Sequence, residues 1–338
     1  MRSALTATMA GALVVSVLVA IAIGPVGVPV DEVVRIIVDR LAGRGGTGTA
    51  DLIVWRLRLP RVLMAAVVGA GLALAGAVVQ TVVRNPVADP HLLGLSSGAS
   101  VGAVMVLTSG AALLGVVTVP LAAFAGATLA MFVVLAMAQQ RGRLQPLRLV
   151  LVGVACAHLF SGVTSFMLAR TSDTAAQQQI IFWLLGGLSG TQWESLPIPA
   201  LVLAGAIVVV LAKARRMNVL VLGDDAGAAL GVDAARLRRQ LLLLTTLLTG
   251  TVVAVSGGIG FVGLIIGHLA RMLVGADHRR MLPVTVALGA CFLIWADVLA
   301  RIVIAPAELP VGVVTAFLGV PLFLLVMRRS GHRLETVS

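Results

Sequence analysis

Ionisable side chains inside the apolar segments limit the chemistry that this 338-residue chain can perform. Asp297 and His158 are the only two that fall deep within apolar runs. In a bilayer such groups typically relay protons or ions, or pair with an opposite charge. Arg301 follows Asp297 by four residues, a spacing that places both side chains on one helix face. We therefore predict an Asp297–Arg301 ion pair rather than an ion relay.

Motifs of enzymes and of ATP-binding proteins are missing from the sequence. It contains no H-E-x-x-H, no G-x-S-x-G and no pair of intramembrane aspartates suited to cutting peptides. The only lysine, Lys213, follows Leu211 and Ala212, so no G-x-x-x-x-G-K phosphate-binding loop can be written. Cys156 and Cys291 lie in apolar runs without the spacing of metal ligands, and we expect both in the core. The sequence therefore predicts a protein that is not an enzyme and binds no metal.

The composition places these residues in a membrane protein. Hydrophobic residues make up 59% of the chain and charged residues 12%, against about 25% charged residues in soluble domains. A spanning helix needs about 20 apolar residues, and ten apolar runs approach or exceed this length: 5–23, 63–83, 92–107, 113–138, 147–169, 196–212, 241–255, 259–274, 282–304 and 311–327. We predict an all-α polytopic membrane protein with one domain over residues 1–338. A secretory signal peptide is the alternative for the first run, although Gly24 and Pro25 offer no clear cleavage site.

The net charge of +11 would suit a nucleic-acid partner on a soluble fold, but its distribution indicates membrane orientation instead. With ten spans and a cytoplasmic N-terminus, seventeen cations and six acidic residues fall on the cytoplasmic side. The outer side receives eight cations and eight acidic residues, and its segment 30–55 reads as a loop with a short helix. Because arginine and lysine concentrate in cytoplasmic loops, we predict that both termini are cytoplasmic. We expect membrane lipid around the spans and no nucleic-acid partner.

Glycine and proline mark the places where helices approach closely or stop. Glycines such as Gly69, Gly76 and Gly263 let helix backbones approach where no hydrophobic effect drives association. Prolines at two span ends predict structural breaks, with plain turns as the alternative. The break residues are Asn85, Pro86, Pro90 and Pro310.

The cytoplasmic loop over residues 214–238 is the longest on that side. Asp224 and Asp225 favour the start of a short helix, Gly231 can end it, and a second short helix is expected from Asp233. A solvated loop would not need its apolar residues, which are Val219, Leu220, Leu222, Leu230 and Val232. Since the chain has neither an ATP site nor an ion relay, we predict that this loop docks an energy-supplying partner, with an idle loop as the alternative.

Seven motifs, in order along nearly the whole chain, resemble those of the FecCD family of binding-protein-dependent ABC importer permeases. That family carries ferric siderophores, haem or cobalamin. The motifs are R-L-P-R (58–61), G-A-G-L-A-L-A-G-A-V-V-Q (69–80), R-N-P-V-A-D-P-H-L-L-G-L-S-S-G-A (84–99), W-L-L-G-G-L-S-G-T-Q-W (183–193), L-G-D-D-A-G-A-A-L-G-V (222–232), G-G-I-G-F-V-G-L-I-I-G-H-L-A-R (257–271), and D-V-L-A-R (297–301) with E-L-P-V-G-V-V-T-A-F-L-G-V-P-L-F (308–323).

The resemblance implies a type II importer in which two ten-helix permeases, either two copies of this chain or one with a homologous permease, enclose a translocation path. Two cytoplasmic ATPase subunits would use ATP and Mg²⁺, and an external binding protein would deliver the substrate. In the family, outer arginines receive acidic residues of that binding protein, and the matching positions are Arg58, Arg61 and Arg301. The coupling helix that contacts the ATPase matches Leu222, Gly223, Asp224, Asp225, Ala226, Leu230, Gly231 and Val232.

The fifth and tenth spans line the path in the family, but no motif assigns individual path residues. On these two spans the polar or soft side chains are Thr164, Ser165, Met167 and Thr315, which we take as the candidates for lining the path. The chain departs from the family at Gly267, which stands where proline usually precedes the histidine, here His268. Glycine permits a bend there without forcing one, and we include Gly267 among the predicted structural breaks.

These features predict a permease subunit in the inner membrane of a bacterium that imports an iron chelate, namely a ferric siderophore. The same architecture importing haem or cobalamin is the alternative. An ion-coupled secondary carrier is the third.

Overall fold

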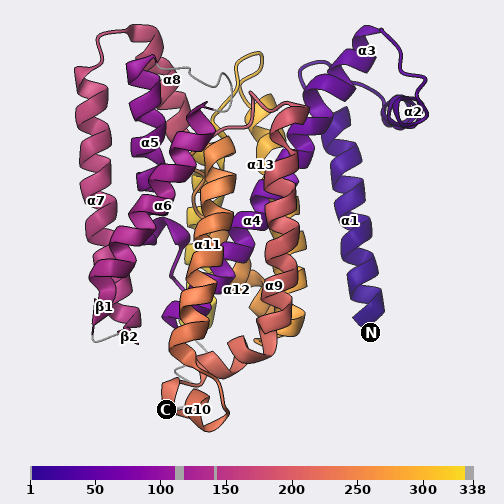
Figure 1. The fold of residues 1–338 in the computed structure, drawn as a ribbon. Coiled ribbons are helices and arrows are strands. Elements are labelled where there is room, and N and C mark those ends of the chain that lie inside the picture. Colours follow the sequence, from indigo (N-terminus) through magenta and orange to yellow (C-terminus); the bar gives the residue numbers. More distant parts are fainter. Residues whose placement is uncertain (1, 111–117, 141–142, 332–338) are drawn as a thin grey trace.

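A computed structural model describes residues 2–110, 118–140 and 143–331, and within them the chain is a bundle of helices (Figure 1). The helices are α1 (Arg2–Ala22), α2 (Val30–Leu41), α3 (Thr49–Asp51), the π-helix η1 (Leu52–Arg58), α4 (Leu59–Val83), the 3₁₀-helix η2 (Pro90–Leu93), α5 (Leu95–Ser109), α6 (Thr118–Ala138), α7 (Pro146–Arg170), α8 (Thr174–Leu185), the 3₁₀-helix η4 (Trp193–Ser195), α9 (Pro197–Val221), α10 (Asp224–Ala229), α11 (Ala234–Ser256), α12 (Val262–Val274), α13 (His278–Ile302) and α14 (Val311–Gly331). A two-residue antiparallel ladder joins β1 (Gln139–Gln140) to β2 (Arg143–Leu144).

Ten apolar helices account for the predicted spans. Six segments are long and apolar enough to cross a membrane: Thr49–Val83, Thr118–Ala138, Pro146–Arg170, Trp193–Val221, Ala234–Ser256 and His278–Ile302. Four shorter apolar helices complete the set: Thr8–Ala22, Leu95–Ser109, Val262–Val274 and Val311–Leu325. The all-α polytopic fold is confirmed. Helix α1 begins at the same end of the bundle as α10, which agrees with a cytoplasmic N-terminus (Figure 1).

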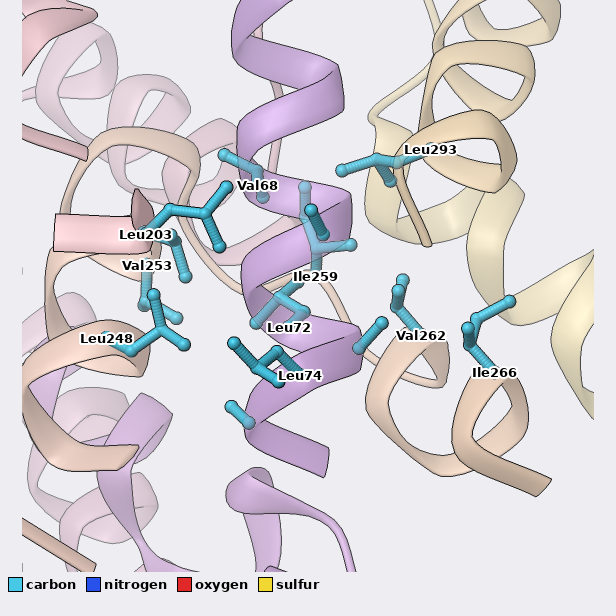
Figure 2. Close-up of a cluster of buried hydrophobic side chains, with 14 of the residues drawn as sticks. Val68, Leu72, Leu74, Leu203, Leu248, Val253, Ile259, Val262, Ile266 and Leu293 are labelled. Atoms are coloured by element: carbon cyan, nitrogen blue, oxygen red, sulfur yellow. The ribbon is translucent and has the colours of Figure 1, made fainter. Parts of the chain in front are cut away.

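The central helix of the bundle is α4, whose side chains are buried along almost its whole length. It packs against α13, α11, α12 and α9. Figure 2 shows Val68 and Leu72 of α4 among apolar side chains from these neighbours, such as Leu248 of α11 and Leu293 of α13. Pro60 follows η1 within the continuous helical segment Thr49–Val83, and its ring fixes a helical φ angle there. Any movement of α4 must therefore involve most of the bundle.

Glycines bring α4 into backbone contact with two neighbours, as predicted. A Cβ atom on Gly69 would collide with the carbonyl oxygen of Gly289 on α13, and one on Gly76 with the backbone of Gly263 on α12. These positions have no room for a side chain, so the close packing of helices expected for a membrane bundle is confirmed.

Three segments differ from the sequence-based expectations. Part of the predicted outer loop, Leu52–Arg58, is helical and runs directly into α4. Helix α8 lies between the predicted fifth and sixth spans and was not expected. The prediction of a second short helix from Asp233 is wrong, because Asp233 is the N-cap of the long helix α11. Its Oδ1 accepts the backbone N–H of Arg236 at 2.9 Å.

Candidate functional site

An ion cluster joins three elements at the outer end of the bundle. Arg61, in the first turn of α4, donates from Nε to Oδ1 of Asp297 on α13 at 2.9 Å. Its Nη1 contacts both carboxylate oxygens of Glu308, at 2.9 and 3.0 Å, in the segment before α14. Arg301 Nε lies 3.1 Å from Asp297 Oδ2. The predicted Asp297–Arg301 pair is confirmed, and Arg61 and Glu308 complete a neutral cluster of four side chains.

The end of α1 is held by Arg301 of this cluster and by Arg58. Arg58 donates to the carbonyl oxygens of Ile21 at 2.8 Å and Ala22 at 3.2 Å. Arg301 donates to the carbonyl oxygens of Ala20 at 3.0 Å and Ile23 at 3.1 Å. The last carbonyls of a helix have no partner within the helix and carry its negative dipole end. The two guanidinium groups thus satisfy the C-terminus of α1 and attach it to η1, which runs into α4, and to α13.

The three arginines assigned to binding-protein docking are therefore engaged inside the chain. Arg58 is 7% exposed, Arg61 8% and Arg301 3%. Arg56, by contrast, lies exposed two residues before Arg58. The docking role of the three arginines stays a prediction. What the structure adds is a second role for each, in holding helices together.

The predicted coupling segment forms a short projecting helix at the opposite end of the bundle (Figure 1). Gly223, with φ of 113°, precedes α10, and Gly231, with φ of 71°, follows it, so both turns use backbone conformations that favour glycine. Leu222 and Leu230 are 67% and 61% exposed. The remaining residues of the predicted set are Asp224 and Asp225, which are exposed, and Ala226 and Val232, which are partly exposed. The segment therefore presents apolar side chains to the outside of the chain.

The start of α10 is tied to the bundle by ion pairs that the sequence reasoning missed. Asp224 accepts hydrogen bonds from Arg84, which follows the last residue of α4, and from Arg238 on α11. Arg84 is 140 positions away from Asp224 in the sequence. No local sequence pattern predicts the Arg84–Asp224 pair, because the two residues belong to separate motifs.

A polar chain crosses the cytoplasmic ends of three helices close by. Thr81 Oγ1 of α4 lies 2.7 Å from His278 Nε2, and His278 Nδ1 lies 2.6 Å from Asn218 Oδ1 of α9. Asn218 donates to Asp277 at 2.8 Å. This bond from Asn218, together with the backbone N–H of Arg279, lowers the pKa of Asp277 below its ordinary value. The sequence reasoning missed this chain of contacts too.

The four residues assigned to the translocation path take different positions. Thr164 and Thr315 are buried, and each donates to a carbonyl oxygen of its own segment, Phe160 and Gly312 respectively, at 3.0 Å. Ser165 is exposed on α7 and Met167 partly exposed. Of the four, only Ser165 is fully open at the surface of this chain.

Ser165 belongs to a stripe of small and polar residues on α7 that lies exposed on the chain. The stripe consists of Ala155, His158, Ser161, Gly162 and Ser165, which recur at intervals of three and four residues. The neighbouring exposed face of α7 is apolar and carries Leu159, Val163 and Phe166. His158 lies twelve residues after Pro146 in the 25-residue helix, which is near its middle. The two faces of α7 therefore suit different surroundings.

Of the positions predicted as structural breaks, four lie in turns or at helix starts and one lies within a continuous helix. Asn85 accepts the backbone N–H of Val87 at 3.0 Å in the turn that also holds Pro86, Pro90 begins η2, and Pro310 directly precedes α14. The break predicted at Gly267 is wrong, because α12 continues through this residue without interruption. A Cβ atom there would lie 3.0 Å from Gln80 Oε1 and 3.6 Å from Ala77, so glycine serves the packing of α12 on α4.

Comparison with known proteins identifies the class of this bundle. The FecCD transport family matches residues 12–329, and the chain belongs to that family. It is thus a permease subunit of the ABC importer class, and ATP hydrolysis resides in a separate ATPase.

Several curated relatives are import permeases. The chain is 44% identical over 83% of its length to the cobalamin import system permease protein BtuC of Halobacterium salinarum, covering 74% of that protein. It is 42% identical over 85% of its length to the hemin transport system permease protein HmuU of Yersinia pestis, covering 87% of it. It is 40% identical over 84% of its length to the iron(3+)-hydroxamate import system permease protein FhuB of Bacillus subtilis, covering 73% of it. Relatives of similar identity thus differ in cargo.

A solved structure has the same fold. An inward-facing metal-chelate type ABC transporter superposes with a TM-score of 0.86 at 30% sequence identity, covering 97% of this chain and 99% of the other.

Proposed function

We propose that this chain forms the membrane path of an ATP-driven importer for an iron chelate, with a ferric siderophore as the first candidate. The observation that carries the proposal is the exposed stripe on α7. A histidine and two serines near mid-bilayer are costly against lipid and normally face a protein interior or a water-filled cavity. The stripe of His158, Ser161 and Ser165 therefore favours a hydrated path bounded by a partner permease.

The energy source follows from the arrangement of charges. Asp297, a deep acidic residue of the chain, is fully buried between two arginines and is not available to carry protons or cations. This argues against an ion-coupled carrier. The exposed side chains of Leu222 and Leu230, which flank α10, instead suit docking to a cytoplasmic ATPase. ATP-driven closure of two such ATPases would displace the coupling helices and alternate access to the path.

The proposed assembly contains two permeases, two ATPases and an external binding protein in a bacterial inner membrane. A second copy of this chain would place two α7 stripes around one path. Docking of the binding protein through Arg58, Arg61 and Arg301 is part of the proposal. Glu308 is the most open acid of the outer cluster, with a side chain 35% exposed. An external carboxylate would reach Arg61 by taking its place.

Cobalamin is the second candidate cargo, favoured by the 44% identical relative, and haem by the 42% identical one. The test uses the chain reconstituted in liposomes with its ATPase and its binding protein. Uptake of a ferric hydroxamate, haem and cobalamin is measured with ATP, without ATP, and with a proton or sodium gradient alone. Uptake of an iron chelate that requires ATP would support the proposal. Uptake driven by a gradient without the ATPase, or ATP-dependent uptake of cobalamin alone, would overturn its energy source or its cargo respectively.

A further inference from the structure

Asp224, the first residue of α10, is held by guanidinium groups from two different helices. Arg238 of α11 donates from Nη1 to Oδ2 at 2.8 Å and from Nη2 to Oδ1 at 2.5 Å, which is a bidentate pair. Arg84 donates from Nη2 to Oδ1 at 2.5 Å. The short helix is therefore attached at its N-terminus to both α4 and α11.

The two arginines differ in what holds them. The Arg238 side chain is only 3% exposed, whereas its partner Asp224 is 53% exposed. If Asp224 moved away, the buried guanidinium group of Arg238 would lose its anion, which is unfavourable. The Arg84 side chain is 33% exposed and belongs to the left-handed residue that ends α4, at φ of 55°. Its Nη1 lies 3.6 Å from the place where a Cβ on Gly223 would be. Arg84 thus covers the turn into α10.

The other end of α4 carries the outer ion cluster. Helix α4 has 25 residues, which at a rise of about 1.5 Å each makes roughly 37 Å. Arg61 in its first turn binds Asp297 and Glu308, and Arg84 just past its last turn binds Asp224. One buried, closely packed helix therefore connects the coupling helix with the outer face.

We propose that Asp224 is a positioning residue that makes α10 move together with α4 and α11, so that α4 transmits displacement between the ATPase side and the outer face. This rests on the proposed function, in which α10 docks the ATPase. The physical reason is that moving α10 alone would break three charged hydrogen bonds and leave the buried Arg238 guanidinium group without its carboxylate partner. Moving the three helices as one body breaks none of them.

The test measures substrate transported per ATP hydrolysed, and stimulation of ATPase activity by the loaded binding protein, in the complete reconstituted transporter. Arg84→Ala removes the link to α4 while Arg238 still holds Asp224. Asp224→Asn weakens both links. Arg239→Ala is the matched control, because Arg239 is an exposed arginine beside Arg238 with no ion pair among the described residues. Arg84→Lys keeps a positive charge beside Asp224 and should therefore retain part of the wild-type ratio of substrate transported to ATP hydrolysed.

We expect Arg84→Ala and Asp224→Asn to lower the transport-to-ATP ratio by roughly two- to thirty-fold, the range for residues that carry coupling between sites. ATPase subunits should co-purify in wild-type amounts. A ratio equal to that of Arg239→Ala would overturn the proposal. So would loss of the bound ATPase, since Asp224 would then serve docking rather than transmission. Failure of the wild-type transporter to take up any chelate with ATP would instead refute the proposed function.

Discussion

Replacing Asp297 by asparagine tests whether the outer ion cluster holds the bundle together. The substitution keeps the size of the side chain and one oxygen for Arg61 Nε, but it removes the negative charge between two guanidinium groups. Asp297 is fully buried, and the side chains of Arg61 and Arg301 are 10% and 4% exposed, so water cannot replace the lost carboxylate. Breaking a buried ion pair from one side costs about 3–5 kcal/mol.

The lower end of that range applies, because Glu308 still neutralises Arg61 and carbonyl oxygens of α1 still accept from Arg301. We therefore expect a loss of about 3 kcal/mol, which is a fall in Tm of about 6 °C at roughly 2 °C per kcal/mol. Thermal unfolding of the purified protein in detergent measures it. Asp31→Asn is the control, since Asp31 is exposed on α2 and a surface change shifts stability by about 0.5 kcal/mol at most. Equal Tm values for the two variants would refute the role assigned to the cluster.

Three further predictions concern other contacts. Arg58→Met should free the C-terminus of α1, because it removes charged hydrogen bonds worth about 1.5 kcal/mol. We expect backbone hydrogen exchange at residues 20–26 to become about tenfold faster or more. Unchanged exchange at these residues would refute the capping role of Arg58. Gly312→Ala should destabilise the bundle by about 1–3 kcal/mol, because the new Cβ would collide with the Leu185 carbonyl oxygen, whereas Gly190→Ala meets no atom within 4 Å and should be neutral in the same melting assay. The pKa of Asp277 is lowered in the folded chain, so its stabilisation is complete above its ordinary value of 3.8 and is lost as the pH falls through the folded value; the Tm difference between wild type and Asp277→Asn should therefore be larger at pH 7 than at low pH, and a constant difference would contradict this account.

Sequence reasoning found features whose parts lie close together in the chain. The Asp297–Arg301 pair follows from a spacing of four residues on one helix, and α10 follows from the acidic residues in its first turn and Gly231 after it. Arg61 joins Asp297 from 236 positions away, a partner that no local pattern specifies. Periodicity shows that a residue faces the protein, but tertiary packing decides which neighbour it meets.

The misjudged segments show where local patterns mislead. Helix α8 begins with threonine, two alanines and three glutamines, which are too polar to signal a span, and its end at Gly186 comes after only 12 residues. Asp233 carries the signal of a helix start, and the helix that it starts is α11 itself. Gly267 looked like a bend because glycine permits one, whereas the space beside Gln80 explains its presence without any break.

The distribution of arginine has a physical meaning that the charge count alone does not reveal. On the outer side, Asp297 and Glu308 neutralise Arg61 and Arg301, whereas Arg58 keeps its positive charge and binds carbonyl oxygens of Ile21 and Ala22. On the cytoplasmic side, Arg238 binds Asp224. In both places a planar guanidinium group joins neighbouring segments at their ends, because it can bind several oxygens at once. Arg58, Arg61, Arg301 and Arg238 thus connect elements within the chain, and a docking role for the first three must be compatible with the oxygens that they already bind.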